Sequence, residues 1–157
     1  MQASVTAEEH YRRGRDLLTL REAPGALEHF RTAQLLDRAN PRYRSYYGLG
    51  LALVDRRFDE ALELCRSAAK EEFFNPELYY NLARVHLAFG FKAEAIRYLR
   101  RGLMIDPGNA EMADELQRLG MRLRPVLGFL PRRHPMNRML GRVRRIWSDE
   151  ADFSAAA

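Results

Sequence analysis

Hydrophobic positions recur along this chain at the three- and four-residue spacing that is typical of amphipathic α-helices. The clearest example runs from Asn75 to Pro107, where two such patterns are separated by a short turn at Gly90. Small residues occur in both patterns, at Ala83 in the first and at Ala95 and Gly102 in the second. Small side chains allow two helices to approach closely, so this stretch predicts an α-helical hairpin.

The second half of this hairpin pattern occurs twice more, upstream. Its small residue is Ala26, then Ala61, then Ala95, with steps of 35 and 34 residues. For the first helices we align Gly14, Gly50 and Ala83, and their steps of 36 and 33 residues are less regular. A single helical hairpin cannot bury its own apolar face, whereas hairpins stacked in series can. We therefore expect three stacked copies.

This arrangement resembles the tetratricopeptide repeat, in which small and large residues alternate at fixed offsets over about 34 positions. The resemblance implies an all-α, right-handed α-solenoid of three helix-turn-helix repeats, followed by a capping helix. It also implies a protein that binds other proteins along a concave groove. The expected boundaries are a repeat domain over residues 7–121, with repeats at about 7–40, 41–75 and 76–109 and a capping helix at 110–120, and then a basic tail over 122–157.

Local start signals refine the helix boundaries. Thr6 and Glu9 have the spacing of a capping box, and Asn75 precedes a proline, which favours a helix start. After Asn40 and Pro41 we expect a short irregular segment over residues 42–45 before the third helix begins. The predicted helices are about 7–20, 24–38, 46–54, 58–72, one opening at 76, 92–105 and 110–119.

The composition is that of an ordinary globular protein, with 46% hydrophobic and 30% charged residues. No apolar run approaches the ~20 residues that a transmembrane helix needs. The first ten residues lack the basic and apolar regions of a signal peptide. Cys65 is the single cysteine, so an internal disulfide is excluded. These features lead us to expect a cytoplasmic protein.

The net charge of +5 arises from the tail, because residues 122–145 contain eight arginines and no acidic residue. After Pro135, apolar residues at helical spacing predict a basic amphipathic segment that ends near Trp147. This segment resembles the C-terminal part of some small bacterial repeat proteins of the same type, for which it implies no defined activity. Its basic positions include Arg132, Arg133, Arg138, Arg142, Arg144 and Arg145.

Two interpretations of the tail remain open. The favoured one is that its apolar residues dock on the repeats, which leaves the arginines as a basic surface for an acidic partner. The alternative is a peripheral tether in which the tail binds anionic membrane or nucleic acid through its arginines. Membrane and nucleic acid are disfavoured as partners, because the tail has enough apolar residues to fold back on the body.

Candidate catalytic residues are few. Cys65 aligns with apolar residues of the other repeats, so we expect an inert core residue. The histidines, His10, His29, His86 and His134, fall at unrelated repeat positions. The sequence contains no metal-ligand or phosphate-binding motif. We expect a protein that is not an enzyme and that uses no cofactor or metal.

Function is therefore expected to reside in the concave groove. The alignment of the repeats predicts a ladder of tyrosines, with arginines and apolar residues on the same face. Tyrosine and arginine are favoured at binding hot spots, although packing of the tyrosines within the core remains the alternative. The predicted groove residues are Tyr11, Arg15, Leu18, Tyr47, Leu51, Val54, Tyr80, Arg84 and Leu87.

The expected partner is another protein, bound as a peptide or as a helix. Some members of the resembled family hold the C-terminal carboxylate of a chaperone with lysine and asparagine. Here only Asn81 matches such a residue, so a chaperone adaptor is disfavoured. Arg15 and Arg84 remain suited to an acidic peptide. The sequence leaves open whether the chain also forms a homo-oligomer.

Overall fold

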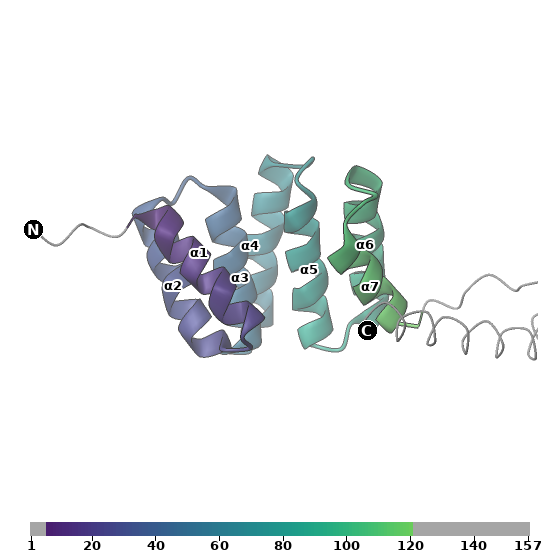
Figure 1. Ribbon diagram of the computed structural model, residues 1–157, viewed down its shortest axis with the longest axis horizontal. Coiled ribbons are helices and arrows are strands. Elements are labelled where there is room, and N and C mark those ends of the chain that lie inside the picture. Colours follow the sequence, from purple (N-terminus) through teal and green to yellow (C-terminus); the bar gives the residue numbers. More distant parts are fainter. Residues whose placement is uncertain (1–5, 121–157) are drawn as a thin grey trace, which may run out of the picture. The chain divides into compact units, whose positions relative to one another are not determined.

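The computed structural model describes residues 6–120, which fold into α-helices joined by short turns (Figure 1). Within this range there are seven helices and no β-strand. The helices are α1 (Ala7–Thr19), α2 (Ala23–Leu36), α3 (Pro41–Leu53), α4 (Phe58–Glu71), α5 (Pro76–Ala88), α6 (Lys92–Ile105) and α7 (Ala110–Arg118).

The helices are arranged as three antiparallel pairs and one additional helix. The helices of each pair pack against each other, α1 on α2, α3 on α4 and α5 on α6. Successive pairs join through α2 with α3 and through α4 with α5, while α7 packs on α6 (Figure 1). The direct contact between α3 and α5 aligns the first helices of successive pairs. The predicted all-α solenoid of helix-turn-helix repeats with a capping helix is confirmed.

Side-chain caps define where the helices begin. The Thr6 hydroxyl accepts from the Glu9 N–H while the Glu9 carboxylate accepts from the Thr6 N–H, which completes the predicted capping box. At α3 the prediction of an irregular start is wrong. The Asn40 side chain accepts the backbone N–H groups of Arg42 and Tyr43, and Pro41 occupies the first turn. This cap starts α3 five residues earlier than we expected.

The turn inside each pair contains one residue with a positive φ. It is Arg21 in the first pair (φ 63°), Arg56 in the second (φ 57°) and Gly90 in the third (φ 80°). Glycine adopts this conformation without steric cost, whereas the two arginines incur a small penalty for it. The Arg56 guanidinium lies 4.4 Å from the centre of the Phe89 ring, a cation–π contact that offsets part of that cost.

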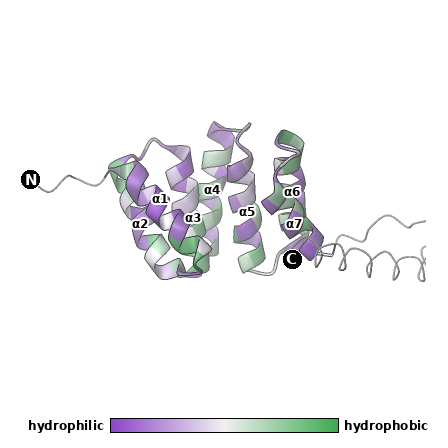
Figure 2. Ribbon diagram, in the orientation of Figure 1, coloured by the Kyte–Doolittle hydropathy of each residue, from purple (hydrophilic) through white to green (hydrophobic). Residues whose placement is uncertain are grey.

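The core runs between the helices of all three pairs. Figure 2 shows that each helix carries both hydrophilic and hydrophobic residues. Many of the hydrophobic ones are buried between neighbouring helices. Phe30 is fully buried and stacks near Tyr11 and Tyr46. A smaller cluster around Leu99 and Met112 joins α7 to the third pair.

The expectations for the tail, including the basic positions and the docking of Trp147, lie outside the described residues. Among the helices that the structure describes, none has both the length and the apolar character of a membrane span.

Candidate functional site

The register of the three first helices determines which residues face the same way. Counted from each helix start, the eighth residues are Gly14, Gly48 and Ala83. A Cβ on Gly14 would meet the Phe30 ring at 2.6 Å, and one on Gly48 would meet Cys65 Sγ at 3.1 Å. Phe30 and Cys65 occupy equivalent positions in α2 and α4. Gly48 is therefore the residue that packs against the second helix of its own pair.

The alignment of Gly50 with Gly14 is thus wrong by two residues. A Cβ on Gly50 would meet Leu27, which belongs to the preceding pair. Ser45 instead occupies the position of Tyr11 and Tyr80 in the second repeat. Ser45 contacts Cys65 as Tyr11 contacts Phe30. The predicted ladder of three tyrosines does not exist.

Tyr47 lies on another face of α3. It is half-buried, it packs against the core, and it hydrogen-bonds Arg31 of α2. Its neighbour Tyr46 occupies the place near Tyr11 instead, with the two ring centres 5.2 Å apart in an edge-on arrangement. The one-residue difference matters because successive residues of a helix point about 100° apart.

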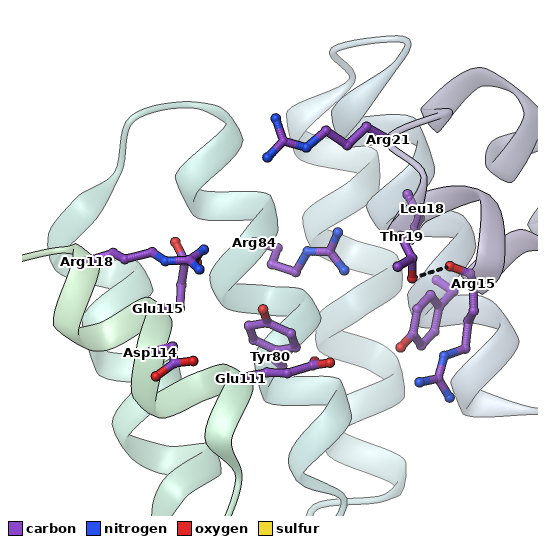
Figure 3. A pocket seen from close by; sticks show the side chains of 11 residues that line it. Arg15, Leu18, Thr19, Arg21, Tyr80, Arg84, Glu111, Asp114, Glu115 and Arg118 are labelled. Carbon is purple, nitrogen blue, oxygen red and sulfur yellow. Dashed lines mark hydrogen bonds and ion pairs between the residues drawn. The ribbon is translucent and has the colours of Figure 1, made fainter. Parts of the chain in front are cut away.

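A cavity of about 620 Å³ opens on the face formed by α1, α3, α5 and α7. Figure 3 shows Tyr80 and Arg84 of α5 in its centre, the α1 residues on one side and the α7 residues on the other. The cavity is lined by Arg15, Leu18, Thr19, Arg21, Tyr46, Tyr80, Arg84, Glu111, Asp114, Glu115 and Arg118.

Four of the nine predicted groove residues line this cavity: Arg15, Leu18, Tyr80 and Arg84. The other five do not. Leu51 is fully buried in the core, and Val54 and Leu87 pack at the edges of the two hydrophobic clusters. Tyr47 faces α2, and Tyr11 is buried in a polar network.

This polar network joins the first helices of the three repeats around one carboxylate, Glu77. Glu77 Oε1 accepts from the Tyr46 hydroxyl at 2.7 Å and from the Tyr11 hydroxyl at 3.2 Å. Arg42 Nε donates to Glu77 Oε2 at 3.2 Å, and an Arg15 nitrogen lies 3.5 Å from Oε1. Because α1, α3 and α5 each contribute to this network, it fixes the spacing of the helices that carry the cavity.

Burial changes the acidity of the tyrosines in and beside this network. Desolvation, and then the nearby Glu77 carboxylate, raise the pKa of Tyr46 and of Tyr11 above the ordinary value. Desolvation also raises the pKa of Tyr80. All three hydroxyls therefore stay protonated near neutral pH and remain hydrogen-bond donors.

The charges of the cavity are divided by element. Arg15, Arg21 and Arg84 lie on α1, its following turn and α5. Glu111, Asp114 and Glu115 lie on α7, together with Arg118, which pairs with Glu115 at 3.8 Å (Figure 3). The Arg84 guanidinium lies 5.6 Å from the centre of the Tyr80 ring. Within residues 6–120 neither Arg84 nor Asp114 forms an ion pair, so both remain able to bind a charged ligand.

The candidate reactive side chains lie apart from the cavity. Cys65 is fully buried, and burial raises the pKa of its thiol to about 12. Its Sγ donates to the Ser45 carbonyl at 3.2 Å. His86 is 3% exposed and stacks on Tyr98 with ring centres 5.3 Å apart. Both residues are part of the packing, as expected from the sequence for Cys65.

Asn81, the residue that matched a carboxylate clamp, is also buried. Its Nδ2 donates to the Ser45 hydroxyl at 3.1 Å, inside the array. A ligand in the cavity therefore cannot use this amide without displacing core contacts.

The acidic residues of α7 were missed as cavity residues because we treated α7 only as a solvating cap. The 34-residue spacing of the repeats is the sequence signal that identifies them. Glu111 follows Glu77 by 34 residues, and Glu115 follows Asn81 by the same step. Extending the register into α7 would have placed both acids on the face of the first helices.

Comparisons with known proteins show which family and which solved structures this chain is similar to. Residues 52–119 match the family model described as tetratricopeptide repeat. No match is found among curated proteins. Among solved structures, the first TPR of Spaghetti (RPAP3) bound to the HSP90 peptide SRMEEVD is 19% identical with a TM-score of 0.56. The match covers 75% of this chain and 93% of that one.

Two further structures are similar to the same degree. The Arabidopsis OM64 TPR domain is 19% identical with a TM-score of 0.56, covering 74% of this chain and 96% of that one. The second TPR domain of human RPAP3, in complex with the HSP70 peptide SGPTIEEVD, is 19% identical with a TM-score of 0.54, covering 72% and 93%. Identities this low establish the shared fold alone.

Proposed function

We propose that this chain is a tetratricopeptide-repeat protein that acts as a non-catalytic protein-interaction module, and that its cavity between α1, α5 and α7 binds a peptide or helix of a partner. We further propose that the bound segment carries both acidic and basic side chains. The observation that carries this proposal is the division of charge across the cavity, with arginines on α1 and α5 on one side and three carboxylates on α7 on the other, where Arg118 pairs with only one of them, Glu115.

The residues of the cavity suit protein recognition. Tyr80 and Arg84 belong to the residue types that dominate binding hot spots, because they combine a large contact area with hydrogen-bonding groups. Tyr80 is half-buried, so its ring is held in place while one part remains accessible. The hydrogen-bond network around Glu77 fixes the positions of α1, α3 and α5, which carry this face. Less conformational entropy is therefore lost when a ligand binds.

The similar structures support the class of partner. Two of them hold a peptide, SRMEEVD in one and SGPTIEEVD in the other. Both peptides contain neighbouring acidic residues, which Arg15 and Arg84 would favour here. The carboxylates of α7 add a requirement for a basic group on the other side of the cavity. Because Asn81 is buried, we do not extend the carboxylate clamp to this chain.

A display library of random peptides, selected on the purified protein, tests the proposal. Enriched peptides are expected to contain acidic and basic residues together. Arg84→Glu should weaken their binding at least about tenfold, because one attractive charge becomes repulsive. Arg97→Glu is the matched control, since Arg97 is exposed on α6 and lies outside the cavity. Peptides that bind the wild type and the Arg84→Glu variant equally well would refute this function.

A further inference from the structure

A second cleft lies on the other side of the helix pairs, between α4 and α6. It has a volume of about 390 Å³ and shares no lining residue with the cavity of the first helices. We infer that this cleft is a second binding site, for an acidic peptide segment that contributes one large apolar side chain. Three cations and three aromatic residues form its characteristic lining: Arg66, Lys70, Arg101, Phe73, Tyr79 and Tyr98.

The cations give the cleft a charge of one sign. Arg66 and Lys70 follow each other by one turn of α4, and Arg101 faces them from α6. All three are exposed, and no acidic residue lines the cleft. Within residues 6–120 none of the three forms an ion pair. Their mutual repulsion is relieved when a ligand supplies carboxylates.

The two acidic residues that directly follow Lys70 have partners outside the cleft. Glu71 pairs with Arg44 at 3.0 Å, and Glu72 accepts from the Asn75 side chain at 2.9 Å. Both contacts tie the end of α4 to neighbouring segments. The positive charge of the cleft is therefore not neutralised by the carboxylates that follow Lys70.

The aromatic wall is already in position for a ligand. The Tyr79 hydroxyl donates to the Phe73 carbonyl at 3.0 Å, which fixes the loop between α4 and α5. Arg101 lies over the Tyr79 ring at 5.1 Å, so its guanidinium is held at the edge of the cleft. Phe73 remains 53% exposed. An apolar side chain that enters the cleft would cover this exposed ring without a change of the backbone.

Charge and size together identify the occupant. Three cations around one small cleft match a few carboxylates and one apolar anchor. The cavity of the first helices contains both signs of charge, so the same peptide would meet repulsion there from Glu111 and Asp114. A nucleic acid would fit less well, because its affinity depends on several phosphate contacts along a longer cationic track.

Fluorescence anisotropy with the full chain and the labelled peptide EDEWDE tests this site. The wild type should bind, and the double variant Arg66→Glu/Arg101→Glu should bind at least about tenfold more weakly. The matched control is Lys92→Glu/Arg97→Glu, which changes the net charge equally at exposed positions of α6 outside the cleft. Equal losses in the two double variants would mean that only net charge matters, and would overturn the site.

The apolar anchor is tested with two neighbouring phenylalanines. Phe73 lines the cleft, whereas Phe74 is exposed next to it and does not. Phe73→Ala should weaken binding of EDEWDE by about fivefold or more, and Phe74→Ala should have little effect. Replacing the tryptophan of the peptide with alanine should remove the difference. Identical affinities of the two variants for EDEWDE would contradict the proposed anchor.

Two further measurements distinguish this cleft from the first cavity and from a nucleic-acid site. The variant Arg15→Glu/Arg84→Glu should still bind EDEWDE, so failure of the first cavity would leave this result unchanged. An oligouridylate should not compete with the peptide, and competition that is lost in the Arg66→Glu/Arg101→Glu variant would show a nucleic-acid site instead. Thermal melting of each variant distinguishes a loss of binding from a loss of fold.

Discussion

Replacement of Glu77 by alanine should destabilise the repeat array more than any other single removal of a carboxylate within residues 6–120. Its carboxylate, 23% exposed, accepts from Tyr46 at 2.7 Å and from Tyr11 at 3.2 Å. These tyrosines are 5% and 1% exposed, so water cannot easily replace the lost acceptor. The change therefore leaves two buried hydroxyls without their strongest partner.

The magnitude follows from the number and the burial of these bonds. A hydrogen bond to a charged group contributes about 1.5–3 kcal/mol, and the two tyrosines together contribute about 3 kcal/mol at the low end. The side chains of Arg15 and Arg42 are 48% and 39% exposed, so their ion pairs with Glu77 add little after solvent screening. We expect a loss of about 3 kcal/mol in the free energy of unfolding, or about 10 °C in melting temperature.

Urea denaturation followed by circular dichroism measures this loss. Glu71→Ala is the matched control, because Glu71 also pairs with one arginine but is 52% exposed in that pair. The control should cost at most about 1 kcal/mol. Adding Tyr46→Phe to Glu77→Ala should cost less than the sum of the two single changes, since both remove the same bond. A Glu77→Ala variant as stable as Glu71→Ala would refute the role of the network.

Three further outcomes are expected. Gly48→Ala should destabilise the protein by about 1–3 kcal/mol, because the added Cβ would lie 2.9 Å from the Ala61 carbonyl oxygen. Gly102→Ala should cost less, since the added Cβ meets the flexible end of a methionine side chain. Urea denaturation of the two variants measures the difference. Stability should fall in acid more steeply for the wild type than for His86→Leu. Burial lowers the pKa of His86 in the folded protein below its unfolded value of about 6.5. The stability that the neutral, buried His86 contributes is therefore complete above that unfolded pKa and is lost as the pH falls from there towards the folded pKa. Melting curves of the two proteins at several pH values measure this loss. The Cys65 thiol should react with a thiol reagent only on unfolding, because it is fully buried and its pKa is raised to about 12; labelling that is fast in the native protein would contradict this.

Local signals in the sequence predicted the helices well. Capping at Thr6 and the Asn-Pro start at Asn75 depend on neighbouring residues only, and both were identified correctly. The start of α3 was misjudged, although Asn40 carries the same signal. The prediction relied on the alignment of Gly50 with Gly14 and gave too little weight to the Asn40 cap.

The site was harder to predict because it depends on register and on contacts between distant residues. A shift of two residues in α3 exchanged Ser45 for Tyr47 at one position of the groove. The bonds from Glu77 to Tyr11 and Tyr46 span 66 and 31 residues, and no local pattern reveals them. Helix periodicity thus predicts which residues are apolar and buried, whereas the partners of buried polar groups require the packed structure.

The affinity of a library-selected peptide for two tyrosine variants tests the central claim most directly. Tyr80 lines the cavity between α1, α5 and α7, whereas Tyr47 packs toward α2. The account predicts that Tyr80→Ala weakens binding by about thirtyfold, which corresponds to about 2 kcal/mol, while Tyr47→Ala changes it less than about threefold. Equal affinities of the two variants, both folded by circular dichroism, would contradict the claim that this cavity binds the partner.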